Sequence, residues 1–204
     1  MTGLTWRIRR SIADDEGTSL IEVVVAVAIF AAVMATVFQA MISSNRYVND
    51  IDDQIRGQTD ARLVMDRFTR DLRQAYSGGA ANVLATMTGT ELSYYSPDRS
   101  TPMRLRRITY RLDSANRTLL RGETLSANMA LPPAPTTFVT QLTAVSSTTL
   151  FTYKDVLGDL ETIAAEVRTV TLNVAVDRTT TRAPGPQDYA VTVDLRAHRP
   201  TGSE

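Results

Sequence analysis

Cysteine is absent from the 204 residues of this chain, and histidine occurs once, at His198. The lack of cysteine excludes disulfide bonds and cysteine metal sites. A single histidine excludes a multi-histidine metal site, and its place near the C-terminus argues against a Ser-His-Asp triad. No glycine-rich phosphate-binding loop is present either. We therefore expect a protein that is not an enzyme, that needs no cofactor and whose fold is held by packing alone.

Net charge is also lacking, because 22 basic and 22 acidic residues cancel, so no overall field favours nucleic acid. A local basic stretch remains, and it could hold a nucleic-acid strand by phosphate contacts and stacking. Its members are Arg99, Arg104, Arg106, Arg107, Arg111, Arg117 and Arg121, with Tyr94, Tyr95 and Tyr110 nearby. Successive residues of a strand point to opposite faces of a sheet, so these side chains would not share one surface. Asp98, Asp113 and Glu123 also reduce the local positive charge. The sequence therefore disfavours nucleic acid as a partner.

The segment from Leu20 to Phe38 is a long apolar run. Glu22 is its only charged residue, and Thr36 is the only other polar one. At about 1.5 Å per helical residue the run spans roughly 28 Å, close to the hydrocarbon thickness of a bilayer. The run therefore predicts a membrane helix in which Glu22 is the exception.

Basic residues precede this run at Arg7, Arg9 and Arg10. The positive-inside rule puts them in the cytoplasm and the C-terminal body outside it, as in a single-pass protein of the plasma (inner) membrane. A secretory signal has its apolar region before the cleavage site. Here the apolar run follows the expected cut, so cleavage would remove only the cytoplasmic tail and keep the anchor.

The sequence Gly17-Thr18-Ser19-Leu20-Ile21-Glu22, followed by three valines, resembles the class III signal of type IV pilins and type II secretion pseudopilins. The resemblance implies that a prepilin peptidase cuts after Gly17 and methylates the new amine of Thr18. Threonine departs from the usual phenylalanine at that position. Glu22 matches the glutamate at the fifth mature position.

Glu22 has a physical role without the resemblance. A carboxylate in the bilayer costs about 2 to 4 kcal/mol, so it needs a partner or a place near the membrane edge. The cleaved Thr18 amine could be that partner, in the same helix or in a neighbouring subunit. The resemblance implies the second arrangement, in which this pair guides assembly. The alternative is that Glu22 lies at the interface and favours the positive end of the helix.

Helix signals continue beyond the apolar run. Apolar residues recur mostly at steps of four, at Ile51, Ile55, Val64, Phe68, Leu72 and Tyr76, which predicts a face packed on a core. The other face offers i,i+4 pairs such as Arg67 and Asp71, and Gly78-Gly79 supplies a stop. We predict one helix from about Ser19 to Ser77, with loosening near Ser43-Ser44-Asn45 left open.

The period changes to two from Val83 onward, which predicts a β-rich head. Expected strands include Val83–Met87, Leu92–Tyr95 and one around Phe151 and Tyr153, with a hairpin turning at Asp113–Asn116. Val170–Val176 and Tyr189–Leu195 predict a closing antiparallel hairpin. A phase slip at Arg106-Arg107 predicts a bulge. Pro132, Pro133 and Pro135 mark a loop.

The sequence leaves undecided whether one turn binds a metal ion. Asp155, Asp159 and Glu161 could offer oxygen ligands to calcium, although a solvated turn explains the same residues.

We expect an α+β, pilin-like fold with a long N-terminal helix packed on an antiparallel β-rich head. Its parts would be a leader (1–17), a transmembrane helix half (18–42), an outer helix half (43–77) and a head (78–204). Tyr110–Leu112 with Leu119–Arg121, Phe151–Tyr153 with Gly158, and Val191–Arg196 are similar to J-type minor pseudopilins and W-type minor pilins. The resemblance implies a minor subunit whose partners are other minor and major pilins or pseudopilins, prepilin peptidase and the membrane. The alternative is a membrane-tethered binding module that acts alone in adhesion or DNA uptake.

Overall fold

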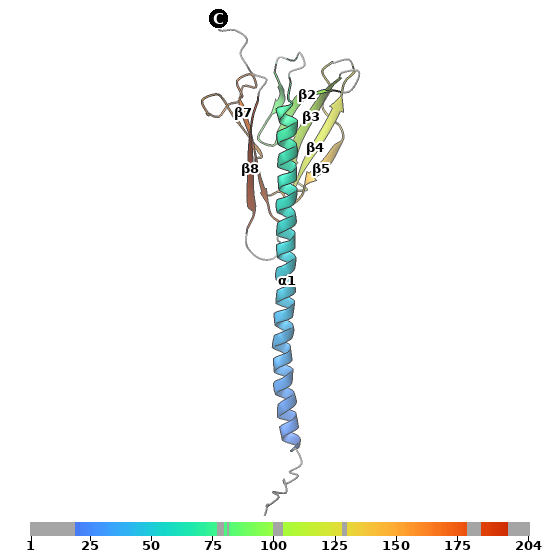
Figure 1. The fold of residues 1–204 in the computed structure, drawn as a ribbon, viewed down its shortest axis with the longest axis vertical. Helices are drawn as coiled ribbons and strands as arrows, with labels where there is room; N and C mark the ends of the chain where they lie inside the picture. The colour runs from blue at the N-terminus through green and yellow to red at the C-terminus, as the bar shows by residue number, and fades with distance from the viewer. Residues whose placement is uncertain are drawn as a thin grey trace, which may run out of the picture. The chain divides into compact units, whose positions relative to one another are not determined.

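The computed structural model describes residues 19–76, 80, 82–99, 104–127, 130–178 and 185–195. Within them, one helix, α1 (Leu20–Arg73), precedes eight strands that form two antiparallel sheets (Figure 1). The chain divides into two compact units, residues 1–49 and 50–204, and all the strands belong to the second. The predicted α+β class, with a long N-terminal helix and an antiparallel β-rich head, is confirmed.

The helix is continuous through Ser43, Ser44 and Asn45, so the loosening considered there is not found. It ends at Arg73, four residues before the predicted end at Ser77, whereas Gly78 and Gly79 lie outside the described residues.

A hydrogen-bonded turn explains this earlier end. The amide of Ala75 donates to the carbonyl of Leu72 at 3.0 Å, and the amide of Tyr76 donates to the carbonyl of Tyr95 at 2.8 Å. Tyr95 lies in a strand, so the chain passes from helical to sheet-type partners within one turn.

The first sheet has five strands in sequence order: β1 (Leu84–Met87), β2 (Glu91–Asp98), β3 (Arg104–Asp113), β4 (Thr118–Leu125) and β5 (Phe138–Leu142). The second has three: β6 (Phe151–Lys154), β7 (Thr169–Val176) and β8 (Gln187–Asp194). Every neighbouring pair is antiparallel. The predicted closing hairpin is confirmed, with Val170 opposite Val193 and Leu172 opposite Val191. β5 was not predicted.

The turn between β3 and β4 confirms the predicted hairpin. The Asp113 carboxylate accepts hydrogen bonds from the amides of Ala115 and Asn116, both at 3.1 Å. Arg117 then takes a positive φ of 53° and leads into β4. Asp113 therefore sets the turn by capping its backbone.

The bulge predicted at Arg106-Arg107 is wrong. β3 pairs residue for residue with β2 and β4 through both arginines. The sequence loses its period of two there because β3 is buried on both faces: Leu105 and Thr109 on one, Ile108 and Tyr110 on the other. A strand covered on both sides need not alternate.

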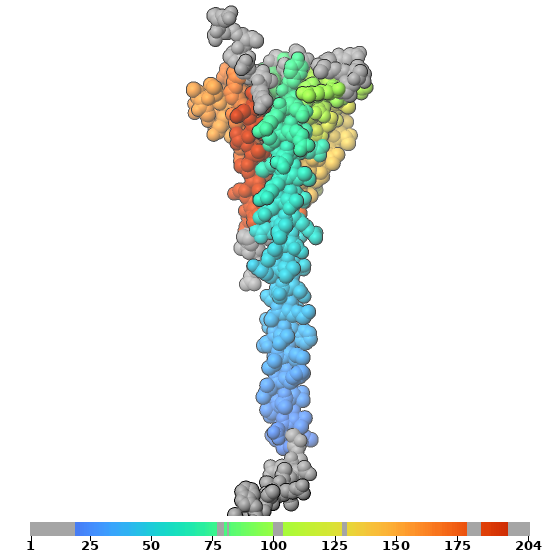
Figure 2. All heavy atoms as spheres, viewed as in Figure 1, coloured from blue at the N-terminus to red at the C-terminus, as the bar shows by residue number. Residues whose placement is uncertain are grey.

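The C-terminal part of α1 packs against both sheets and closes a single core. Its outward face stays uncovered between them (Figure 2). Val64, Phe68 and Leu72 are buried as predicted, but Ile55 and Tyr76 are exposed. The inner face continues toward the N-terminus through small residues, Ala61 and Gly57, instead.

Gly57 lies against the end of β7 and Arg178. A β-carbon there would lie 3.5 Å from Cδ of Arg178 and 3.6 Å from Cγ1 of Val176, which are ordinary van der Waals distances. Helix and chain therefore pack closely at this point, and a methyl group at residue 57 would fit without displacing either of them.

Candidate membrane and assembly site

The N-terminal half of α1 presents an apolar surface on all sides. From Leu20 to Asn49 every residue is exposed, although its most apolar window has a mean hydropathy of 2.6. By length and composition α1 can cross a membrane. Its one hydroxyl between Leu20 and Phe38 is paired within the helix, since Thr36 donates to the carbonyl of Val33 at 2.7 Å. Such internal pairing is what a lipid environment demands of a spanning segment.

Glu22 lies in the first turn of this helix. The amides of Glu22 and Val23 both donate to the carbonyl of Ser19, at 2.8 and 3.2 Å. A shallow groove on the helix surface is lined by Glu22, Val23, Ala26, Val27 and Phe30. Within the residues that the structure describes, the Glu22 carboxylate has no ion-pair partner. A negative charge at this position interacts favourably with the positive N-terminal end of the helix dipole. It also remains available to a cation from outside the described residues.

The other two predicted processing residues, Gly17 and Thr18, lie outside the described residues. The cut after Gly17 and the methylated amine of Thr18 therefore stay predictions.

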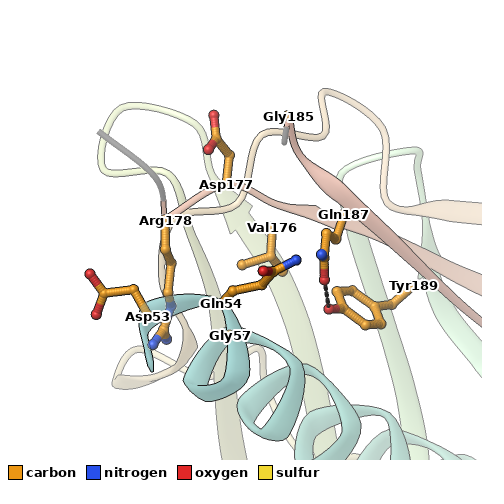
Figure 3. Close-up of a pocket in the computed structure, with 9 residues that line it drawn as sticks. All are labelled: Asp53, Gln54, Gly57, Val176, Asp177, Arg178, Gly185, Gln187 and Tyr189. Carbon is orange, nitrogen blue, oxygen red and sulfur yellow. Dashed lines mark hydrogen bonds between the residues drawn. The ribbon is translucent and has the colours of Figure 1, made fainter. Parts of the chain in front are cut away.

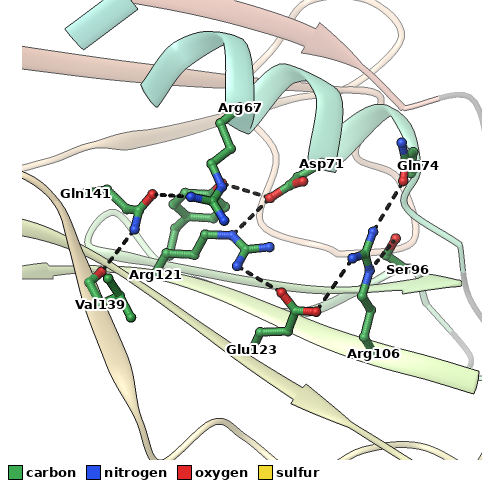
Figure 4. A network of polar contacts seen from close by, with 10 residues as sticks. Arg67, Asp71, Gln74, Ser96, Arg106, Arg121, Glu123, Val139 and Gln141 are labelled. Atoms are coloured by element: carbon green, nitrogen blue, oxygen red, sulfur yellow. Dashed lines mark hydrogen bonds and ion pairs between the residues drawn. The ribbon is translucent and has the colours of Figure 1, made fainter. Parts of the chain in front are cut away.

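In the head, an ion pair joins α1 to the first sheet (Figure 4). The Arg121 Nε atom lies 3.0 Å from Oδ2 of Asp71, and its side chain is only 8% exposed. Arg121 also contacts Glu123, with NH1 2.9 Å from Oε2. Arg106 extends the network, since its NH1 atom lies 3.5 Å from Oε1 of Glu123 and its NH2 atom donates to the side chain of Gln74. Helix and sheet are thus held by directional contacts as well as by apolar packing.

Tyr110 completes this network from β3. Its hydroxyl donates to Oδ2 of Asp71 at 3.1 Å, and its ring packs edge-on against Phe68 at 5.3 Å between centroids. Burial first, and then the negative charge of Asp71, raise the pKa of Tyr110. Burial is the largest single effect on the pKa of Arg121 and would lower it, but Asp71, Tyr110 and Glu123 together outweigh burial, and the pKa is raised. Both groups therefore keep their protonated forms at neutral pH.

Sequence reasoning missed this pair, because it assigned Asp71 to Arg67 in the same helix. In the structure the Arg67 NH1 atom donates to the side chain of Gln141, a residue of β5, at 3.0 Å (Figure 4). A helical i,i+4 spacing was the only signal in the local sequence, and the true partner lies 50 residues away.

A small hollow lies between α1 and the ends of β7 and β8 (Figure 3). Arg178 NH2 donates to Oδ2 of Asp60 at 2.7 Å, and the Tyr189 hydroxyl donates to Oε1 of Gln187 at 2.7 Å. The hollow has a volume of about 20 Å³, enough for about one water molecule. It is too small for a substrate.

The basic stretch is divided between the two faces of the first sheet. Arg106 and Arg121 face α1, whereas Arg107 and Arg111 lie on the opposite face. Arg107 donates to the Ser93 hydroxyl at 2.7 Å, and Arg111 stacks over Phe138 at 4.3 Å. Of the tyrosines, Tyr94 and Tyr110 are fully buried. These side chains do not form one basic, aromatic surface of the kind that binds single strands.

The acidic turn after β6 uses its carboxylates on the backbone. Oδ1 of Asp155 accepts from the amides of Leu157 and Asp159 at 2.8 and 2.9 Å, and Oε1 of Glu161 accepts from Thr162 and Ile163. Among the described residues there is no group of three acidic, histidine or cysteine side chains placed to hold a metal ion. The geometry is that of a hydrogen-bonded turn.

The sequence matches no family model, and it matches no curated protein. Function must therefore be argued from the helix, from its single carboxylate and from the head.

Proposed function

We propose that this chain is a minor subunit of a type IV filament system, a type II secretion pseudopilus or a type IV pilus. In this proposal a prepilin peptidase cuts after Gly17 and methylates Thr18, and the mature chain assembles through its N-terminal helix, near the filament tip. The head, with α1 packed on antiparallel sheets, would be a pilin-like fold outside the cytoplasm.

One observation carries the proposal: Glu22 stands in the first turn of a 54-residue helix whose first half is apolar and exposed. A carboxylate among apolar residues is costly in lipid without a cation. Cleavage after Gly17 would create such a cation, the Thr18 amine, four residues before Glu22. An amine from one subunit facing Glu22 of the next would then relieve both buried charges as subunits join.

The continuity of α1 supports the same proposal. The helix runs unbroken from the apolar half into the half whose inner face is buried by the sheets. Small residues in the apolar half, including Ala26, Ala28, Ala31, Ala32 and Ala35, permit close approach of neighbouring helices in lipid.

The decisive experiment is the intact mass of the membrane-extracted chain from cells with and without prepilin peptidase. We expect loss of residues 1–17 and gain of one methyl group only when the peptidase is present. Glu22→Ala and Glu22→Gln should both be processed and inserted normally but fail to enter filaments, because each removes the charge while only one changes the side-chain size. Thr36→Ala, a polar substitution in the same apolar half, serves as the matched control and should assemble.

An unprocessed chain that still carries Trp6 would refute the filament proposal, and the chain would then be a tethered head that acts alone. Filaments that accept Glu22→Ala at the normal level would refute the role of Glu22 in assembly.

A further inference from the structure

The loop between β6 and β7, residues 155–168, displays apolar side chains to solvent. Val156, Leu157 and Leu160 are 79, 82 and 77% exposed, and Ile163 is 54% exposed. The loop stands out from the side of the head, where it is drawn in orange (Figure 2). Four large apolar side chains within eight residues of one loop are unusual on the surface of a monomeric protein, and such patches mark interaction sites.

This loop is also well ordered by hydrogen bonds. In addition to the capping by Asp155 and Glu161, the Asp155 amide donates to the carbonyl of Asp159 at 3.0 Å, and the Glu161 amide donates to that of Tyr153 at 3.0 Å. Gly158 takes a φ of +89°, which suits glycine and lets the chain turn.

Buried residues fix both ends of the loop. Tyr153 is 8% exposed and its hydroxyl donates to the carbonyl of Thr88 at 2.8 Å, while Val167 is 1% exposed. The apolar tip is therefore preorganised, and a partner that binds it need not order the loop.

Charge around the tip limits the choice of partner. Within residues 154–168 the acidic residues are Asp155, Asp159, Glu161 and Glu166, against the basic Lys154 and Arg168. This acidic border disfavours an anionic lipid surface, which attracts basic segments. It fits a protein recess with an apolar floor and arginine or lysine at its rim.

A second copy of this chain is a poor match for such a recess. The hollow on α1 beside Arg70 and Arg73 is basic, but its other lining residues, Asp66, Thr69 and Gln74, are polar. The hollow beside β8 is lined by Asp188, which repels an acidic loop.

We propose that the β6–β7 loop is a docking site for a different protein, which receives Leu157 and Leu160 in an apolar recess bordered by basic side chains. This inference does not depend on the filament proposal, because it concerns the head alone.

The test uses the full chain in its own host cell, with a photoreactive phenylalanine analogue replacing Leu157. We expect irradiation to join the chain to a different protein, at a peptide with apolar residues flanked by arginine or lysine. Leu160→Ser should lower the crosslink yield about tenfold, as expected for loss of one interface anchor. Leu63→Ser is the matched control, because Leu63 is also exposed, at 68%, but lies on α1.

A second variant tests the charge. In Asp159→Lys with Glu166→Lys the loop should keep its shape, because the hydrogen bonds of these two residues use their main-chain atoms. The crosslink yield should fall severalfold, with an unchanged near-ultraviolet circular dichroism spectrum. The proposal would be overturned by crosslinks to lipid or to a second copy, or by the absence of any crosslink. An unchanged crosslink yield in the charge-reversal variant would overturn it as well.

Discussion

Removal of the Asp71 charge should loosen the head more than removal of any exposed charge on α1. Asp71→Asn keeps the shape of the side chain, and its oxygen can still accept from Tyr110, but Arg121 loses the negative charge at 3.0 Å. Breaking a buried pair by removing one partner costs about 3 to 5 kcal/mol. Glu123 remains 2.9 Å from Arg121, so we expect a smaller loss, of about 2 kcal/mol in the free energy of unfolding.

The assay is urea unfolding of the detergent-solubilised full chain, followed by the near-ultraviolet circular dichroism of tyrosine. Tyrosine is the suitable probe because the only tryptophan, Trp6, precedes α1. Asp66→Asn, an exposed carboxylate on the same helix, is the matched control and should change stability by less than about 0.5 kcal/mol.

A double variant separates the pair from its surroundings. Asp71→Leu combined with Arg121→Met removes both charges and leaves apolar side chains, so we expect it to unfold within about 1 kcal/mol of the natural chain. The reasoning fails if Asp71→Asn matches Asp66→Asn, or if the double variant is as unstable as Asp71→Asn alone.

Three further predictions follow from the head. Gly122→Ala should destabilise the head by about 1 to 3 kcal/mol, because the new β-carbon would lie 2.7 Å from Cβ of Pro135; thermal unfolding measures this, and an unchanged midpoint would contradict it. The raised pKa of Tyr110 means that its stabilising contribution is intact below about pH 10 and is lost as the pH rises above that value. Urea unfolding between about pH 8 and pH 11 should therefore show a smaller loss for Tyr110→Phe than for the natural chain. Residues 50–204 should fold without the rest of the chain, since the core begins at Ala61; failure to unfold cooperatively would show that the first unit is required.

The strands that the sequence predicts best are those with one buried face. In β7, Val170, Leu172, Val174 and Val176 are buried, and the alternation in the sequence reports this directly. β3 defeats the same reasoning, because Leu105 on one face and Ile108 on the other are both fully buried. Apolar residues alternate with a period of two only when one face of a strand is buried. A strand that is buried on both faces loses this alternation, and the loss can be mistaken for a bulge.

The extent of the helix and part of its buried face were predicted, but several of its contacts were not. Ile55 fits an apolar stripe by spacing, yet it is exposed, whereas Gly57, which is not part of that stripe, is buried against Val176 and Arg178. Likewise the spacing of Arg67 and Asp71 suits a weak helical pair, whereas Asp71 pairs with Arg121 from β4. The spacing of residues within a helix cannot identify a partner that comes from a strand distant in the sequence.

The candidate site follows the same division. The apolar half of α1 could be predicted, because a helix that is able to cross a membrane is specified by local composition. The role of Glu22 stays a prediction. The exposed tip at Leu157 could not, because large apolar side chains such as Leu157 and Leu160 are buried in most folds, and only the structure shows that these two lie outside the core.

α1 serves two environments with one continuous backbone. Its buried residues begin at Gly57, and before them large side chains such as Ile29 and Phe30 are 61 and 62% exposed. Each fully buried side chain of this size contributes about 1.5 to 3 kcal/mol, and the first half of α1 gains none of this from its own chain. Under the proposed function this stability comes from lipid and from helices of other subunits, and the same environment has to supply a cation for Glu22 or a place for it near the water.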